Sequence, residues 1–168
     1  MQLGWWAHPI FSKTGDYPQI LKDRVAKFSK AENFTRTRLT ELSLGEVDYV
    51  RGTFDFLGLN HYTTNLASPK EEPAGAPPSY AKDVGVLKEQ DQSWPPSAAR
   101  WLRSVPWGMR KILNWIKEEY DNPSVYITEN GYADGGGTND VERVKYHQVS
   151  DQLTYLHFTP RFRSPVHG

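Results

Sequence analysis

Cysteine is absent from this chain of 168 residues, and its absence removes several kinds of chemistry at once. Without thiols there is no disulfide framework, no thiolate metal site and no cysteine nucleophile. The five histidines show no ligand-like spacing, and the triple glycine at 135–137 lacks the Lys-Ser/Thr of a phosphate loop. We therefore expect no metal ion and no other cofactor.

An excess of charge of one sign is also lacking, because 20 Lys and Arg residues balance 20 Asp and Glu residues. No apolar run reaches the roughly 20 residues needed to cross a bilayer. These features argue against a nucleic-acid partner and against a membrane partner. The compartment stays open: secreted or lumenal for a parent protein with a signal peptide, otherwise cytoplasmic. The oligomeric state is open too.

Aromatic residues, in contrast, are abundant, with six Trp, nine Tyr and seven Phe. Flat apolar rings stack on sugar faces, but they serve equally well in a core or at a protein interface. For most of these rings, packing is the interpretation we adopt.

The most informative segment is VYITENG at residues 125–131, an apolar β-branched run that ends on Glu129 and then turns. A buried parallel strand delivers its last side chain to the edge of the sheet where loops gather and substrates bind. Glu129 is therefore a candidate catalytic carboxylate.

Other segments predict helices and a second strand. An acid at 16 and a proline at 18 predict a helix through residue 28, and SKAE at 29–32 predicts a capping box opening another toward Leu42. Residues 53–60 predict a fully buried strand. Residues 63–104 form a long Pro- and Gly-rich connection, typical of a functional loop or a disordered insert.

A further helix is predicted from Ser104, with apolar residues recurring at i, i+3, i+4 and i+7 from Met109. The residues DNP at 121–123 end it, and the strand carrying Glu129 follows. Strand, helix and strand form a βαβ unit, so the two strands should be parallel. Asn60 and Glu129 would then emerge on the same edge of one sheet.

Several motifs together resemble glycoside hydrolase family 1, the β-glucosidases and their relatives. The similarity extends over residues 1–147. It rests on GWWAHP at 4–9, GDYP at 15–18, GTFDFLGLNHY at 52–62, WLRSVPWG at 101–108 and ITENG at 127–131.

The resemblance implies hydrolysis of β-glycosides with retention, by two carboxylates about 5–5.5 Å apart. It implies that Glu129 is the nucleophile and that the Tyr62 hydroxyl orients it. It further implies that Asn60 contacts the sugar and that Trp101 is a platform for the leaving group. Asn60 shares the face of Tyr62 if the strand continues. The alternatives are a core tyrosine, a turn-forming asparagine and a packing tryptophan.

The chain also departs from the family. No Asn-Glu-Pro sequence occurs, so the acid/base glutamate is absent. Asp55 cannot replace it, because it precedes Asn60 by five residues, about 17 Å along a strand. Residues 148–168 lack the family's eighth-strand motifs, and we predict a divergent, poorly ordered tail there.

The expected fold is α/β, an incomplete (β/α)8 TIM barrel holding about the sixth and seventh strands with their helices, in residues 1–147. The expected function is that of a fragment of a retaining β-glucosidase that carries the nucleophile without the acid/base and is inactive alone. The alternative is a non-catalytic sugar- or protein-binding short product of the same family.

Overall fold

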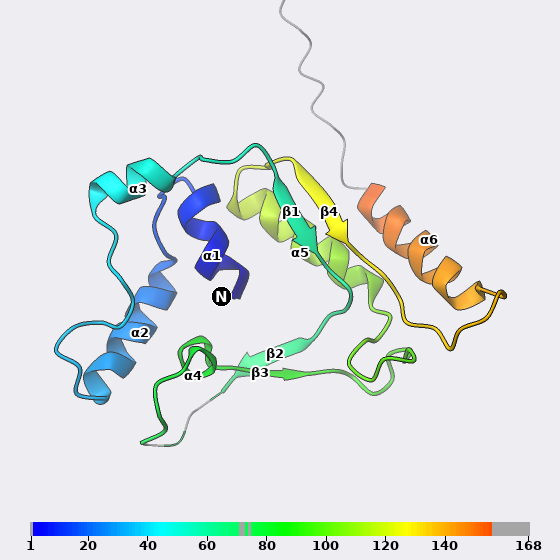
Figure 1. The fold of residues 1–168 in the computed structure, drawn as a ribbon, viewed down its shortest axis with the longest axis horizontal. Helices are drawn as coiled ribbons and strands as arrows, with labels where there is room; N and C mark the ends of the chain where they lie inside the picture. Colours follow the sequence, from blue (N-terminus) through cyan, green and yellow to red (C-terminus); the bar gives the residue numbers. More distant parts are fainter. Residues whose placement is uncertain (1, 71–72, 74, 156–168) are drawn as a thin grey trace, which may run out of the picture. The chain divides into compact units, whose positions relative to one another are not determined.

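The computed structural model describes residues 2–70, 73 and 75–155, which form an α/β protein (Figure 1). Within these residues there are two two-stranded sheets, one made of β1 and β4 and the other of β2 and β3. The elements in chain order are α1 (Gln2–Phe11), α2 (Gln19–Ala31), α3 (Leu44–Val50), β1 (Leu57–Asn60), β2 (Leu66–Pro69), α4 (Tyr80–Val84), β3 (Val86–Glu89), α5 (Pro106–Glu119), β4 (Val125–Glu129) and α6 (Val141–Tyr155).

The pairing of β1 with β4 is parallel. At the beginning of the pair, the Leu57 amide donates to the Ser124 carbonyl at 2.8 Å; at the end, the His61 amide donates to the Glu129 carbonyl at 2.9 Å. Both strands therefore run in the same direction, with α5 between them in the chain. This confirms the predicted βαβ unit.

The prediction that residues 53–60 form a fully buried strand is wrong. β1 begins at Leu57 rather than at residue 53, and burial alternates along it, with Leu57 and Leu59 buried while Gly58 and Asn60 are exposed. On β4, Tyr126 is 61% exposed. Each strand is covered on one face only, because successive side chains point to opposite faces.

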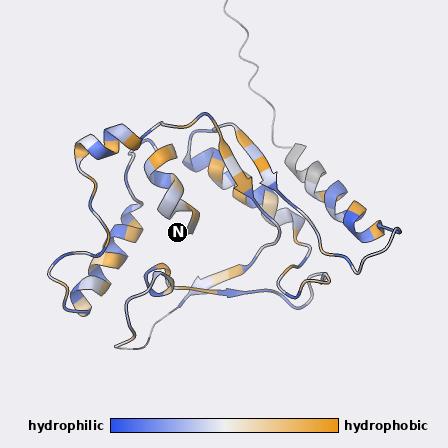
Figure 2. Ribbon diagram, viewed as in Figure 1, coloured by the Kyte–Doolittle hydropathy of each residue, from blue (hydrophilic) through white to orange (hydrophobic). Residues whose placement is uncertain are grey.

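Contacts divide the described residues into two compact units. The first comprises the described residues within 1–58, 65–89 and 116–126; the second comprises those within 59–64, 90–115 and 127–155. In the first, Leu21 and Val25 of α2 form a buried cluster with Leu39. Figure 2 shows hydrophobic and hydrophilic residues mixed along α2, as expected for a helix with one apolar face.

The predicted helix after Asp16 is present as α2, but Pro18 is its N-cap. Asp16 instead accepts hydrogen bonds from the Tyr17 amide and from the Lys22 ammonium. Burial opposes ionisation of Asp16, yet these two hydrogen bonds and the nearby charges of Lys22 and His8 together outweigh it and lower the pKa of the carboxyl group.

The predicted second helix beginning at residue 29 is not formed. Ser29 lies inside α2, where its hydroxyl donates to the Val25 carbonyl and accepts from the Arg38 amide. Its hydroxyl is thus occupied by the returning chain and cannot cap a new helix. The following helix is α3, capped by Ser43.

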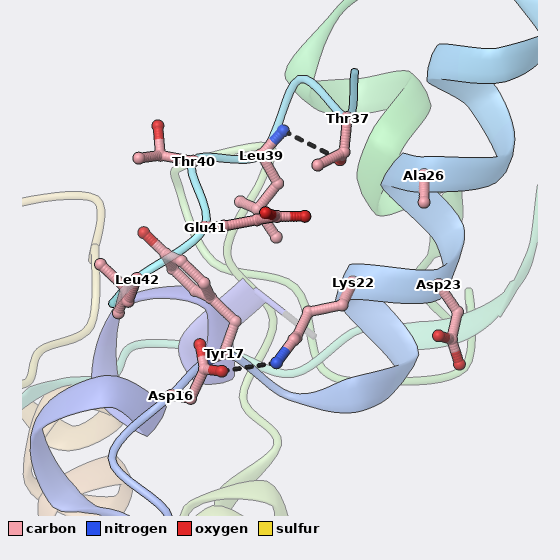
Figure 3. A pocket seen from close by; sticks show the side chains of 10 residues that line it. All are labelled: Asp16, Tyr17, Lys22, Asp23, Ala26, Thr37, Leu39, Thr40, Glu41 and Leu42. Carbon is pink, nitrogen blue, oxygen red and sulfur yellow. Dashed lines mark hydrogen bonds and ion pairs between the residues drawn. The ribbon is translucent and has the colours of Figure 1, made fainter. Parts of the chain in front are cut away.

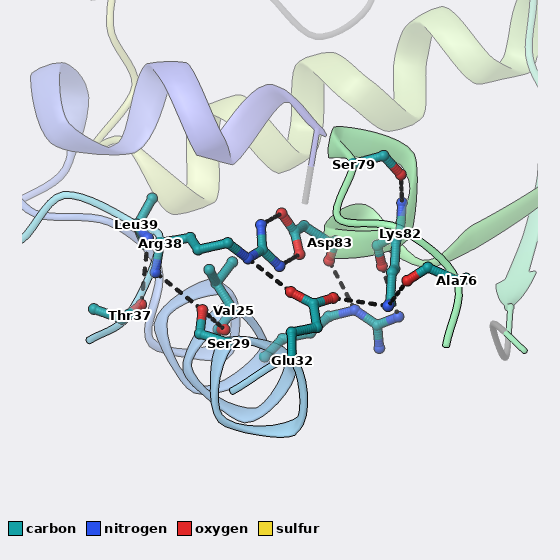
Figure 4. A network of polar contacts seen from close by, with 11 residues as sticks. Val25, Ser29, Glu32, Thr37, Arg38, Leu39, Ala76, Ser79, Lys82 and Asp83 are labelled. Carbon is teal, nitrogen blue, oxygen red and sulfur yellow. Dashed lines mark hydrogen bonds and ion pairs between the residues drawn. The ribbon is translucent and has the colours of Figure 1, made fainter. Parts of the chain in front are cut away.

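Charged side chains join α2, the chain after it and α4 (Figure 4). Arg38 holds Asp83 through two hydrogen bonds of 2.7 Å and Glu32 through one of 2.9 Å. Lys82 pairs with the other oxygen of Glu32 at 2.7 Å. Two cations and two anions balance one another in a poorly solvated place, since Asp83 and Lys82 are buried.

The connection from 63 to 104 has more structure than was predicted. β2 and β3 form an antiparallel hairpin in which Leu66 faces Glu89. α4 lies between the two strands in the chain. Its C-cap is Gly85, whose φ of 56° is left-handed. A side chain on Gly85 would collide with Arg24, because its Cβ would lie 1.6 Å from Nη2.

In the second unit, α5 buries Met109 and Leu113, which confirms the predicted apolar face. Past its end, Asp121 and Asn122 adopt left-handed φ values of 58° and 57° and stop the helix. α6 was not predicted, and it continues across the predicted boundary between residues 147 and 148. The rest of the predicted tail, residues 156–168, lies outside the described residues, so its disorder stays a prediction.

Candidate active site

Glu129 and Tyr62 lie together where the parallel strands end. Glu129 is the last residue of β4, and Tyr62 follows β1 by two residues. The Tyr62 hydroxyl donates to Glu129 Oε2 at 2.8 Å. This hydrogen bond raises the pKa of Tyr62, and burial and the carboxylate charge add smaller effects in the same direction. The phenol therefore stays protonated and holds one carboxylate oxygen.

Asn60 has a different partner. Its side-chain oxygen accepts a hydrogen bond of 2.6 Å from the Thr128 hydroxyl. The inference that Asn60 shares the face of Tyr62 required the strand to continue, but β1 ends at Asn60. Asn60 is exposed. Its hydrogen-bond partner is Thr128, the residue before Glu129, and not Glu129 itself.

Trp101 lies beside Tyr62 and is open to solvent. Its ring centroid is 5.9 Å from that of Tyr62 in an edge-on arrangement, and the residue is 60% exposed. A purely packing tryptophan would be more buried than this. The structure thus brings Trp101, Tyr62 and Glu129 into one place.

A small clamp fixes the segment that carries Trp101. The side-chain Nε2 of Gln90 donates to the Trp101 carbonyl at 2.9 Å. The Thr63 hydroxyl donates to the Arg103 carbonyl at 2.8 Å and accepts from the Arg103 amide at 3.2 Å. Because Thr63 directly follows Tyr62, this clamp ties the indole segment to the phenol.

Tyr146 of α6 also belongs to this place, although no sequence pattern was used to find it. Its hydroxyl lies 2.8 Å from the Tyr62 carbonyl oxygen and 2.6 Å from the Asn130 side-chain oxygen. A usable signal was Asp140 before an acidic first turn, which favours a helix start and would have placed α6.

The first two aspartates that follow Glu129 in the chain, Asp134 and Asp140, are already engaged. Asp140 pairs with Arg143 at 2.6 Å, and Asp134 lies 3.7 Å from the same guanidinium. The Gly136 backbone amide is the main cause that lowers the pKa of Asp134. Asp134 therefore lacks the environment of a proton-donating acid, which needs a raised pKa.

Among residues 2–70, 73 and 75–155, no group of three or more His, Asp or Glu side chains is arranged to hold a metal ion. In the same residues, no helix combines the length and the apolar character needed to cross a bilayer.

A separate hollow of about 360 Å³ lies beside α2 in the first unit (Figure 3). Two of its three acids are held by neighbours: Asp16 is bound by Lys22, and Asp23 by Gln19. It contains none of the predicted site residues, and its chemistry is that of a polar surface recess. It is lined by Asp16, Tyr17, Lys22, Asp23, Ala26, Thr37, Leu39, Thr40, Glu41 and Leu42.

A carboxylate held by a phenol at the carboxyl ends of parallel strands, beside an exposed indole, is the arrangement expected of an α/β glycosidase. Comparison with known proteins names the family. Glycosyl hydrolase family 1 matches residues 1–157, and the chain belongs to that family.

Individual proteins similar to this chain support the family assignment. Lactase/phlorizin hydrolase of Rattus norvegicus is 47% identical over 158 residues, covering 92% of this chain and 8% of that protein. Cytosolic beta-glucosidase of Homo sapiens is 34% identical, covering 89% of this chain and 32% of that protein. The solved structure of aphid myrosinase superposes with a TM-score of 0.76 at 36% identity, covering 90% of this chain and 32% of that one.

The chain thus spans at most about a third of the length of these relatives. The solved neighbours are β-glucosidases and related glycosidases of the TIM-barrel fold. The family match extends to residue 157 and α6 to residue 155. The divergent tail was predicted to begin at residue 148, and this boundary stays a prediction.

Proposed function

We propose that this sequence carries the nucleophile half of a retaining β-glucosidase site, with the acid/base supplied by residues outside it. The observation that carries the proposal is the hydrogen bond of 2.8 Å between the Tyr62 hydroxyl and Glu129 Oε2. Glu129 attacks the anomeric carbon with its free oxygen while Tyr62 holds the other, and a glycosyl-enzyme forms.

The substrate class follows from the same site. Trp101 offers an exposed apolar face for the leaving group of a β-glycoside. Asn60 offers an amide for a sugar hydroxyl, and its bond to the Thr128 hydroxyl orients that amide. The reaction needs no metal or other cofactor, because carboxylates perform both steps.

The burial of the strands supports an incomplete (β/α)8 barrel. The exposed face of the parallel pair carries Phe56 and Tyr126, 51% and 61% exposed, with ring centroids 4.9 Å apart. Inward-facing residues of a closed barrel are packed in layers. We infer that these two exposed rings face the barrel interior and would be covered by further strands.

One observation favours a second function. The sequence has no Asn-Glu-Pro segment, so it has no acid/base carboxylate of its own. A short product of the same family that binds a sugar or a protein without hydrolysis fits this lack. The coding sequence discriminates the two: an in-frame upstream segment with Asn-Glu-Pro favours the glucosidase, and a start codon without one favours the binding protein.

We expect the 168-residue polypeptide alone to leave aryl β-glucosides unhydrolysed. Expelling a poor leaving group requires a general acid, whose contribution is typically 10²–10⁴-fold. The measurement is release of phenol from phenyl β-glucoside, which has a poor leaving group, over a buffer control. Turnover that disappears in Glu129→Gln would show that the chain contains a complete site, contrary to the proposal.

In a longer protein that contains this sequence and turns over β-glucosides, Tyr62→Phe should lower kcat about 10–100-fold. One hydrogen bond to a charged group contributes about 1.5–3 kcal/mol, and Tyr62 makes such a bond to Glu129. Tyr49→Phe is the matched control, because Tyr49 is 84% exposed on α3. Equal kcat values for both variants would contradict the role of Tyr62.

A further inference from the structure

We propose that Tyr146 is a positioning residue that keeps Tyr62 aligned with Glu129, and that α6 is thereby part of the catalytic architecture. The inference rests on the proposed function for its meaning. Tyr146 does not touch the Glu129 carboxylate; it acts on the residues next to the Tyr62–Glu129 hydrogen bond.

The contacts that carry the inference converge from three segments. The Tyr146 hydroxyl, on α6, lies 2.8 Å from the carbonyl oxygen of Tyr62, after β1. It also lies 2.6 Å from the side-chain oxygen of Asn130, which directly follows Glu129. The Tyr146 phenol is therefore in contact both with the backbone of Tyr62, which holds Glu129, and with the side chain of Asn130, which follows Glu129.

Tyr146 is well suited to hold this geometry. The residue is only 5% exposed, and its ring packs 5.5 Å from that of Tyr132 and 5.4 Å from that of His147. Burial raises the pKa of the Tyr146 phenol and outweighs the hydrogen bond with Ser150. The group therefore remains a proton donor through the neutral range, as a bond to a carbonyl requires.

The need for such an anchor follows from the position of Tyr62. Tyr62 comes after β1 has ended, so no strand ladder fixes its backbone beyond the single bond from the His61 amide to the Glu129 carbonyl. A backbone shift of about 1 Å would move the phenol out of hydrogen-bond range of Glu129 Oε2. The Thr63 side chain ties the next residue to Arg103. Tyr146 adds a contact with the Tyr62 carbonyl itself.

The test measures the pKa of Tyr62 in the 168-residue chain. The titration is monitored by NMR through the ¹³C-labelled Cζ atoms of the tyrosines. Tyr146→Phe keeps the ring and removes the hydroxyl. Without its anchor, Tyr62 moves away from the Glu129 charge, so the pKa of Tyr62 should fall. Glu129→Gln sets the full size of this decrease, and we expect Tyr146→Phe to give at least half of it.

Tyr132→Phe is the control, because Tyr132 belongs to the same ring cluster but its hydroxyl bonds to the Pro96 carbonyl at 2.8 Å. It should leave the pKa of Tyr62 unchanged. A folded Tyr146→Phe protein with a lower melting temperature but an unchanged Tyr62 pKa would overturn the proposal, because that is the result of a purely structural role.

A second measurement needs no substitution. In an equal mixture of H₂O and D₂O, the Tyr146 Cζ resonance should split into two lines, because a buried, hydrogen-bonded hydroxyl proton exchanges slowly. A single averaged line would overturn the proposal. Neither readout needs a substrate, so a failure here is distinguishable from a failure of the proposed glucosidase function.

Discussion

Replacing Glu129 with glutamine should abolish covalent capture of 2-deoxy-2-fluoro-β-glucosyl fluoride by a longer protein that contains this sequence. Fluoride leaves without help from a general acid, so formation of the glycosyl-enzyme depends on the nucleophile. The fluorine at C2 destabilises the oxocarbenium-like transition states and lets the intermediate accumulate. Removing a nucleophile costs about 10³-fold or more, and the amide in Glu129→Gln is nearly isosteric.

Mass spectrometry measures the result. The unaltered protein should gain the mass of one fluorosugar, and peptide mapping should place it on Glu129. Glu142→Gln is the control, because Glu142 is an exposed carboxylate on α6 that pairs only loosely with Lys145, at 3.5 Å. It should be labelled like the parent protein. A label on any other carboxylate would remove the nucleophile role from Glu129.

The parts of the fold that sequence predicted best are those set by local chemistry. α5 shows its apolar repeat within a single segment, and the chain stops it with Asp121 and Asn122, which tolerate left-handed φ values. β4 is a β-branched run directly after that stop. No distant residue was needed to predict either element.

Two copies of one pattern show where local reasoning fails. Both SKAE at 29–32 and SLGE at 43–46 match the capping-box spacing. Ser43 forms the box, with its amide bonded to Glu46 Oε2 at 2.8 Å. Ser29 does not, because its hydroxyl is taken by Arg38 nine residues later and Glu32 is taken by Arg38 and Lys82. The two serines differ in their tertiary contacts, and these contacts cannot be predicted from the four-residue pattern.

The hairpin of β2 and β3 was missed for a related reason. Its strands are four residues long and almost wholly exposed, so they lack the hydrophobic alternation that predicts a strand. Their pairing joins Leu66 to Glu89, which are far apart within the connection.

In the site, Glu129 could be placed because it ends a strand of the βαβ unit. Tyr62 lies two residues beyond β1, and its contact with Glu129 was an implication of the family resemblance. Tyr146 and Thr63 could not be placed this way. Their contacts depend on how α6 and the segment of Trp101 pack back onto the strand ends, and side-chain spacing along the chain does not encode that packing.

Asp83→Ala should destabilise the protein by about 3–5 kcal/mol, the cost of removing one partner from a buried ion pair. The Asp83 side chain is 6% exposed and holds the Arg38 guanidinium in two hydrogen bonds of 2.7 Å. Those bonds raise the pKa of Arg38 against the opposing effect of burial, so the arginine cannot neutralise itself. Without Asp83, Glu32 alone faces two cations, Arg38 and Lys82.

Urea unfolding measures this change, and Asp48→Ala is the matched control. Asp48 also pairs with an arginine at 2.7 Å, but its side chain is 67% exposed, so its removal should cost at most about 1 kcal/mol. The double replacement Arg38→Met with Asp83→Leu should be less damaging than Asp83→Ala, because it leaves no unpaired arginine and keeps the Glu32–Lys82 pair. If Asp83→Ala and Asp48→Ala unfold at the same urea concentration, the buried network contributes no more to stability than a surface ion pair does.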